Sequence, residues 1–226
     1  MGNNIFNSGN IETILVRALI IAIPALICIT FHELSHGFTA YRLGDRTAKD
    51  LGRLTFNPIK HLDPIGLIMI LIFRFGWAKP VPVNMYNFKN PRGYMAITAL
   101  AGPLSNLLLA MFVMFIYGLV LEAIGGTNTR GAGAVVREII EGTIYINIAL
   151  AVFNLMPIPP LDGSKVLFSL LREETYMKLM RYERYGIILL ILVVNTSAFR
   201  NTIVRLTGTL FTSFLVIAQT SYQLVN

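Results

Sequence analysis

The segment that decides the fold is residues 11–41, IETILVRALIIAIPALICITFHELSHGFTAY, a run rich in apolar side chains. A transmembrane helix needs about 20 mostly apolar residues, so this run is long enough to cross a bilayer. It is interrupted by Pro24 and, near its C-terminal end, by His32, Glu33 and His36. Ionisable groups inside a span are expensive and therefore favour a functional interpretation. The segment predicts both a membrane-spanning helix and a polar site within it.

The composition of the whole chain agrees with a membrane location. Hydrophobic residues make up 54% of the 226 residues and charged residues only 14%, whereas soluble domains carry about 25% charged residues. A fold of this size cannot bury such an excess away from water. The net charge of +7 comes from basic residues scattered between apolar runs, which is typical of loops beside a membrane. The composition therefore disfavours a soluble enzyme, a disordered chain and a nucleic-acid-binding module, and makes the lipid bilayer the expected partner.

Further apolar runs predict the other membrane elements. Clear spans are expected at 94–121 and at about 138–156, and two C-terminal candidates at 186–198 and 203–219. The run 66–75 is too short to cross and suggests a re-entrant or interfacial segment. The chain is therefore predicted to be an all-α polytopic membrane protein with about five to six transmembrane helices.

Residues 77–90 begin Trp-Ala-Lys-Pro-Val-Pro-Val-Asn, in which apolar and polar residues alternate with prolines. This pattern suits an edge strand or a short β-hairpin near the membrane surface, where proline is tolerated. An irregular loop fits the pattern nearly as well.

Basic residues indicate the orientation of the chain. They gather in 42–64, 77–93 and 172–184, whereas the tail 1–10 has no Lys or Arg. By the positive-inside rule these three stretches are cytoplasmic and the N-terminus is outside. The sequence predicts a multi-pass protein of the plasma membrane, with a re-entrant or hairpin segment near the cytoplasmic face and the polar site nearer that side.

His32 and His36 have the spacing of a metal site. On a helix they share one face, so both imidazoles can reach one metal ion, while Glu33 is positioned to take a proton from a metal-bound water. The alternative is that these are packing or capping residues at a helix end, which the cost of burying them in lipid argues against. Zinc is the expected metal.

A catalytic zinc needs a third protein ligand. His61 is one candidate, but it lies in the basic loop, where a solvated histidine is the ordinary case. Asp162 is a better candidate because the apolar run 150–171 surrounds it and a lone buried carboxylate is costly unless a cation pairs with it. The alternative for Asp162 is a structural helix N-cap after the proline break.

The estimated depths of these groups agree. His32 to His36 lie roughly 9–15 Å from the inner end of their helix, Asp162 about 15 Å from the same side and Asn106 about 18 Å. Polar groups on three separate helices are thus predicted to meet at one level of the bilayer, as expected of a site.

Two asparagines complete the candidate site. Asn106 follows the small-residue stretch Ala101-Gly102-Pro103, which lets a neighbouring helix approach closely. Asn154 precedes the proline break at 157–160. Each could donate a hydrogen bond to a substrate carbonyl or a developing oxyanion. Each could equally bind a backbone carbonyl freed by the adjacent proline, and the sequence leaves both alternatives open.

Together these residues resemble the site-2 protease family of intramembrane zinc metalloproteases. The resemblance rests on three motifs in the family's order: His32-Glu33-x-x-His36, Ala101-Gly102-Pro103-x-x-Asn106 and Asn154-x-x-Pro157-x-Pro159-x-x-Asp162-Gly163. No PDZ or CBS domain accompanies them, so the chain looks like a compact member.

The resemblance implies an enzyme, a zinc metalloendopeptidase that cleaves within or next to transmembrane segments of protein or peptide substrates. It implies that His32, His36 and Asp162 hold Zn²⁺, that Glu33 is the catalytic acid/base, and that Asn106 and Asn154 assist substrate or oxyanion binding. Residues 77–84 look like the family's membrane-associated hairpin, which receives the substrate as an extended strand. We expect a catalytic transmembrane core at 1–171, and a cytoplasmic linker with C-terminal transmembrane helices at 172–226.

Two functions from other classes compete with this interpretation. A metal-ion transporter or permease would also use broken helices and buried ligands, but no inverted repeat is visible and Glu33 has no necessary role there. A catalytically inert membrane receptor is the second, and the intact ligand set argues against it.

Overall fold

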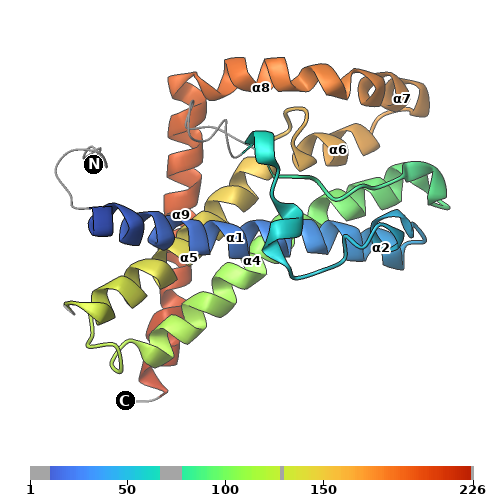
Figure 1. Cartoon of the computed structure of the whole chain (residues 1–226). Helices are drawn as coiled ribbons and strands as arrows, with labels where there is room; N and C mark the ends of the chain where they lie inside the picture. The colour runs from blue at the N-terminus through green and yellow to red at the C-terminus, as the bar shows by residue number, and fades with distance from the viewer. Residues whose placement is uncertain (1–10, 67–77, 128–129, 225–226) are drawn as a thin grey trace.

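The computed structural model describes residues 11–66, 78–127 and 130–224, which are mostly helical (Figure 1). The longer helices form over apolar runs. The α-helices are α1 (Ile11–Arg42), α2 (Thr47–Asp50), α4 (Pro91–Val120), α5 (Ala132–Asn154), α6 (Asp162–Ser169), α7 (Glu173–Tyr182), α8 (Gly186–Val194) and α9 (Ser197–Gln223). Short 3-10 helices are η1 (Pro58–His61), η2 (Met85–Asn87) and η3 (Glu183–Tyr185).

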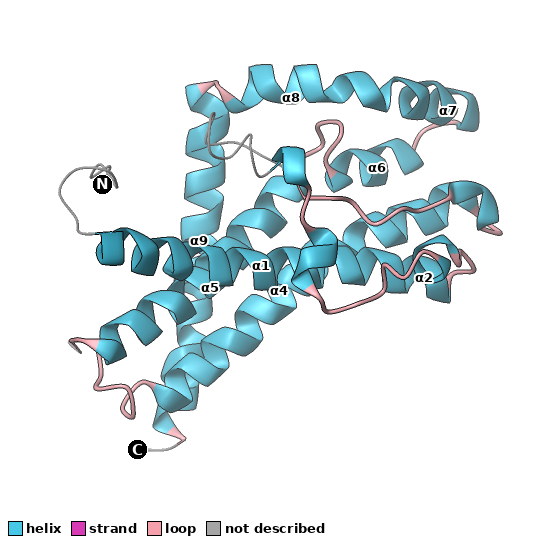
Figure 2. Cartoon of the chain, in the orientation of Figure 1, coloured by secondary structure: helices cyan, strands magenta, loops and turns pink. Residues whose placement is uncertain are grey.

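The described part of the chain contains no β-strand (Figure 2). A single antiparallel bridge joins Leu62 and Ala78, and residues 79–84 continue without regular secondary structure. Pro80 and Pro82 lack the amide hydrogens that a ladder needs. The all-α class is confirmed for these residues. The predicted hairpin is not confirmed, and most of the predicted re-entrant segment, 66–75, lies outside the described residues.

Among the described residues, three helices are long and apolar enough to cross a membrane. They are Arg17–Arg42 within α1, Pro91–Val120 and Ser197–Gln223. The spans predicted at 11–41, 94–121 and 203–219 are therefore confirmed as helices of spanning length.

Two other predicted spans, 138–156 and 186–198, do not form helices that are both long enough and apolar enough to cross a membrane. The run 138–156 falls largely within α5, whose first half carries Glu138 and Glu141. The run 186–198 is divided, because α8 has only 9 residues and the Thr196 side chain accepts a hydrogen bond from Phe199 N–H to start α9. Nine residues are too few to cross a bilayer, so α8 by itself is not a span.

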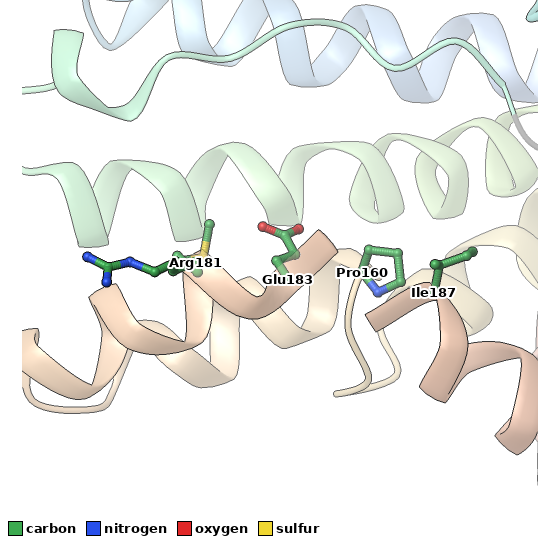
Figure 3. Close-up of a pocket in the computed structure, with 5 residues that line it drawn as sticks. Pro160, Arg181, Glu183 and Ile187 are labelled. Atoms are coloured by element: carbon green, nitrogen blue, oxygen red, sulfur yellow. The ribbon is translucent and has the colours of Figure 1, made fainter. Parts of the chain in front are cut away.

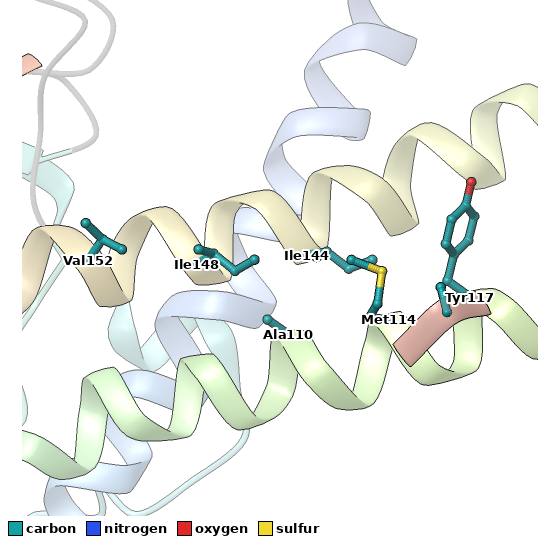
Figure 4. Packing of buried hydrophobic residues seen from close by; sticks show 7 residues of the cluster. Ala110, Met114, Tyr117, Ile144, Ile148 and Val152 are labelled. Atoms are coloured by element: carbon teal, nitrogen blue, oxygen red, sulfur yellow. The ribbon is translucent and has the colours of Figure 1, made fainter. Parts of the chain in front are cut away.

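The core lies between α4, α5 and α9. Residues spaced four apart share a helix face, and such positions on α4 and α5 point towards one another (Figure 4). Gly118 of α4 lets α9 approach closely, since a Cβ there would overlap Ser221 and the backbone of Ala218. The buried cluster consists of Ala110, Met114, Tyr117, Ile144, Ile148, Val152 and Ala218.

The remaining contacts bring the three motifs together. α1 packs against both α4 and α5, so the first motif meets the second. α5 ends at Asn154, and the proline-containing loop turns the chain so that α6 begins at Asp162 and packs on α4. The proline break therefore returns the carboxylate of Asp162 to the place where α4 packs on α1, the helix that carries both histidines.

Candidate metal centre

The three predicted metal ligands meet in the structure. Nε2 of His32 lies 3.0 Å from Nε2 of His36, and Oδ2 of Asp162 lies 3.2 Å and 3.1 Å from these two nitrogens. All three side chains are buried. Ligand atoms around a tetrahedral zinc ion with bonds of about 2.0–2.1 Å are separated by about 3.3 Å. The triangle formed by α1 and α6 is therefore close to one face of a zinc site.

The hydrogen bond of His36 fixes its ring in the form that binds a metal. Nδ1 of His36 lies 2.7 Å from the main-chain oxygen of Thr98. A carbonyl oxygen only accepts, so Nδ1 donates and carries the proton. In the neutral ring Nε2 then presents a lone pair to the cluster, as metal-binding histidines with a carbonyl partner do.

The contact of His32 points to the same chemistry. Nδ1 of His32 lies 3.2 Å from Nδ2 of Asn106, whose Oδ1 is buried and has no hydrogen-bond partner among the described residues. The nitrogen and oxygen of an amide are exchanged by a rotation of the group. When Nε2 of His32 binds a metal, Nδ1 carries the proton, and the rotated amide offers it the orphaned oxygen.

The electrostatics of the cluster also fit a cation. When Nδ1 of both rings carries the proton, the two Nε2 lone pairs, 3.0 Å apart, and the carboxylate oxygen beside them repel one another unless a cation lies between them. Two nitrogens and one carboxylate oxygen are ligands that zinc accepts. The donor set, the tautomer of His36 and the orphaned amide oxygen together show that these residues fit zinc.

Gly102 allows α4 to reach the imidazoles. A Cβ at this position would overlap the ring of His36 and would lie 2.7 Å from Cε1 of His32. Only glycine permits this approach, which confirms the prediction that the small-residue stretch before Asn106 brings a neighbouring helix close.

His61 is not part of the metal cluster. It is fully buried in η1, and Nε2 donates to the main-chain oxygen of Thr55 over 2.9 Å. The expectation of a solvated histidine was wrong, because the loop folds back over the ring.

The second oxygen of Asp162 faces a lysine that sequence reasoning missed. Nζ of Lys165 lies 3.8 Å from Asp162 Oδ1 and 3.5 Å from Oε1 of Glu183. Glu183 also lines a shallow pocket between the proline loop and the start of α8 (Figure 3). The sequence does contain a signal for this contact, because Asp162 and Lys165 are three residues apart and such side chains are neighbours on a helix.

Glu33, the predicted acid/base, is half-buried next to His32 on α1. Its Oε2 accepts a hydrogen bond of 2.7 Å from the main-chain N–H of Val81. Glu33 therefore lies beside the two histidines on α1 and is hydrogen-bonded to the segment that begins at residue 78.

Asp45 anchors the far end of that segment. Its buried carboxylate accepts hydrogen bonds from Asn84 N–H at 2.7 Å, Asn87 Nδ2 at 2.7 Å and Thr47 N–H at 3.0 Å. Burial raises the pKa of Asp45, but the hydrogen bonds from Thr47, Asn84 and Asn87 outweigh it and hold the pKa below its usual range. The carboxylate stays charged and ties the turn after α1 to the start of η2.

Asn154 has a local partner. Its Nδ2 donates to the main-chain oxygen of Leu150, one turn earlier on α5, over 3.0 Å. This contact resembles the backbone-carbonyl alternative, and the role of Asn154 towards a substrate stays a prediction.

Comparisons with known proteins agree with the chemistry of the cluster. The model of a family described as Peptidase family M50 matches residues 19–195. YwhC of Bacillus subtilis is 41% identical over 176 residues, which cover 78% of this chain and 80% of YwhC. Rip2 of Mycolicibacterium smegmatis is 30% identical over 76% of this chain and 65% of its own length. MJ0611 of Methanocaldococcus jannaschii is 34% identical over 66% of this chain and 72% of its own. The names of all three describe zinc metalloproteases, and no solved structure matches the chain.

Proposed function

The chain belongs to peptidase family M50, the site-2 protease family, and we propose that it hydrolyses peptide bonds within or next to transmembrane segments of membrane proteins. It is an intramembrane zinc metalloprotease. The observation that carries the proposed mechanism is the buried cluster of His32, His36 and Asp162, with Glu33 beside it. The two histidines and Glu33 lie on α1, which is long and apolar enough to cross a membrane.

We propose that His32 and His36 bind zinc through Nε2 and that Asp162 binds it through Oδ2. When bound, zinc supplies a Lewis acid that polarises the scissile carbonyl and makes water more acidic. The hydrogen bond from His36 to Thr98 and the amide of Asn106 hold the two rings in the required orientation.

Glu33 is the proposed general base and acid. It takes a proton from the attacking water and passes it to the leaving amine. Its position next to a proposed ligand histidine supports this role, whereas a carboxylate placed there has no necessary role in a metal-ion transporter. Asn106 and Asn154 remain the proposed substrate or oxyanion contacts, and for Asn106 this would be in addition to its contact with His32.

The proposed substrate is a helical membrane segment that must unwind before cleavage, because a helix satisfies its carbonyls internally. Residues 78–84 lie beside Glu33 and are the proposed place where an unwound segment docks. We propose a core at 1–171 and connecting and C-terminal helices at 172–226. We propose that the protein crosses the plasma membrane several times, with the site nearer the cytoplasmic side, as the basic loops indicate.

The substitution Glu33→Gln tests this mechanism. Purified variant protein in liposomes is expected to keep its zinc, measured by mass spectrometry, and to lose cleavage of a single-span reporter peptide. The matched control is Glu174→Gln, which changes an exposed carboxylate on α7. Undiminished cleavage by Glu33→Gln would refute the assignment of the base, and zinc flux into liposomes without proteolysis would favour a transporter.

A further inference from the structure

Residues 78–84 form a fixed part of the site although they lack regular secondary structure (Figure 2). At the start of the segment, Lys79 N–H donates to the main-chain oxygen of His61 over 2.9 Å. The guanidinium of buried Arg53 donates to the main-chain oxygen of Lys79 over 2.8 Å. At the other end, Asn84 is held by Asp45. The segment is therefore tied down on both sides of its middle residue, Val81.

The sequence of this segment leaves one amide donor at its centre. Pro80 and Pro82 have no N–H, so in the run Pro80-Val81-Pro82 only Val81 can donate. That single donor is 2.7 Å from Oε2 of Glu33. The prolines thus exclude any competing main-chain hydrogen bond to the carboxylate from either neighbour.

Val81 is seated by close packing on α1. Its side chain is 7% exposed. A Cβ on Gly37, the residue after His36, would lie 2.9 Å from Cγ1 of Val81 and 2.6 Å from Cδ2 of Leu54. Glycine at position 37 therefore allows the segment to approach the helix that carries Glu33.

From these contacts we infer that Val81 is a positioning residue for catalysis, whose main-chain N–H fixes the carboxylate of Glu33. This inference rests on the proposed role of Glu33 as the base. The N–H holds Oε2, while Oε1 has no hydrogen-bond partner within the described parts of the chain. One oxygen is anchored and the other is available to exchange a proton.

Anchoring matters because Glu has several rotatable bonds, and only some of its rotamers place an oxygen where a proton must move. A hydrogen bond from a neutral donor to a carboxylate is short and strong, so one such bond can select a rotamer. A catalytic group whose orientation is fixed before the reaction raises the rate more than the same group left free to rotate. The effect should therefore appear in the rate of the chemical step.

The substitution Val81→Pro removes the N–H and tests the inference. Reporter cleavage in liposomes is expected to lose on the order of 10- to 100-fold in kcat, with a change in KM of less than about threefold and an unchanged zinc content. The reporter is a single-span synthetic peptide chosen because the unsubstituted protein cleaves it. The comparison variant Lys79→Pro removes a neighbouring N–H that does not contact Glu33, and its larger effect is expected on KM and thermal stability.

A second pair of variants applies if Val81→Pro does not fold. Gly37→Ala pushes Val81 away and should lower kcat, and adding Val81→Ala and Leu54→Ala, which removes both side chains that the new methyl group would strike but keeps the Val81 N–H, should restore at least part of it. If Val81→Pro or Gly37→Ala keeps the full kcat, or the triple variant regains none, the inference is overturned. Glu33→Gln is assayed in parallel: if it still cleaves, the proposed base itself is wrong, whereas its inactivity beside a fully active Val81→Pro contradicts only the positioning role.

Discussion

At the scale of single residues, the chemistry depends on which ring atom of each histidine carries a proton. Thr98 settles this for His36, because its carbonyl can only accept. For His32 the same result requires the oxygen of Asn106 to face Nδ1, and that oxygen has no other described partner. The asparagine is therefore expected to contribute to zinc affinity.

Substitution of Asn106 separates this role from a role as an oxyanion donor. Asn106→Leu should weaken zinc binding about 10- to 100-fold, because Nδ1–H loses its acceptor. Asn106→Asp should keep zinc, since a carboxylate accepts from Nδ1–H at least as well. The measurement is zinc competition against a chelating dye. Equal zinc affinity in all three proteins would show that the amide does not orient the ring.

The sequence predicted which side chains meet in the cluster better than it predicted their surroundings. His32, His36 and Asp162 could be predicted because an ionisable side chain within an apolar run is energetically costly and therefore indicates a function. The burial of His61 could not, since it depends on how the connection after α2 folds back in three dimensions, whereas the approach of Lys165 to Asp162 follows from their spacing on one helix. The side chain of Val81 has no polar group, so the sequence does not indicate a role for this residue. Its proposed role follows only from the position of its main-chain N–H in the structure.

At the scale of helices, the site exists because α4 comes within contact of α1. The two helices approach closely at Gly102, where a side chain would collide with both imidazoles. The position was predictable as a small residue, but which side chains it faces could be known only from the crossing of the two helices.

Gly102→Ala is expected to reduce zinc content and to destabilise the protein by about 1–3 kcal/mol, because the added methyl group overpacks the crossing. The readouts are zinc per protein by mass spectrometry and thermal unfolding in detergent. The matched control is Gly208→Ala on α9, where a Cβ would meet nothing within 4 Å. That control should bind zinc normally and be at least as stable, since Ala favours a helix over Gly. Normal zinc content in Gly102→Ala would contradict the crossing described above.

Helix boundaries were harder to predict than helices. The run 186–198 is apolar enough to suggest a span, but the pair Asn195-Thr196 ends α8 and starts α9. Apolar content does not reveal such a break, because a capping threonine is one polar residue among many apolar ones.

At the scale of the whole molecule, zinc should stabilise the fold, because its proposed ligands come from α1 and from α6, far apart in the sequence. A ligand that binds only the folded state adds about 2.7 kcal/mol when its free concentration is 100 times its Kd. Chelation should therefore lower the Tm in detergent, and added zinc should restore it. In Asp162→Ala the chelator should change the Tm much less. If chelation leaves the Tm of the unsubstituted protein unchanged, this result would argue against zinc binding by the cluster.

The packing of α9 on α4 and α5 has a consequence for biosynthesis. Ala218 belongs to the buried cluster, yet α9 follows every motif residue in the chain. A ribosome makes the segments in order, so the proposed ligands and Glu33 are already present while the face that α9 covers is still open to lipid. A nascent chain that carries these groups would thus wait for α9 to enter the bilayer before this core is closed.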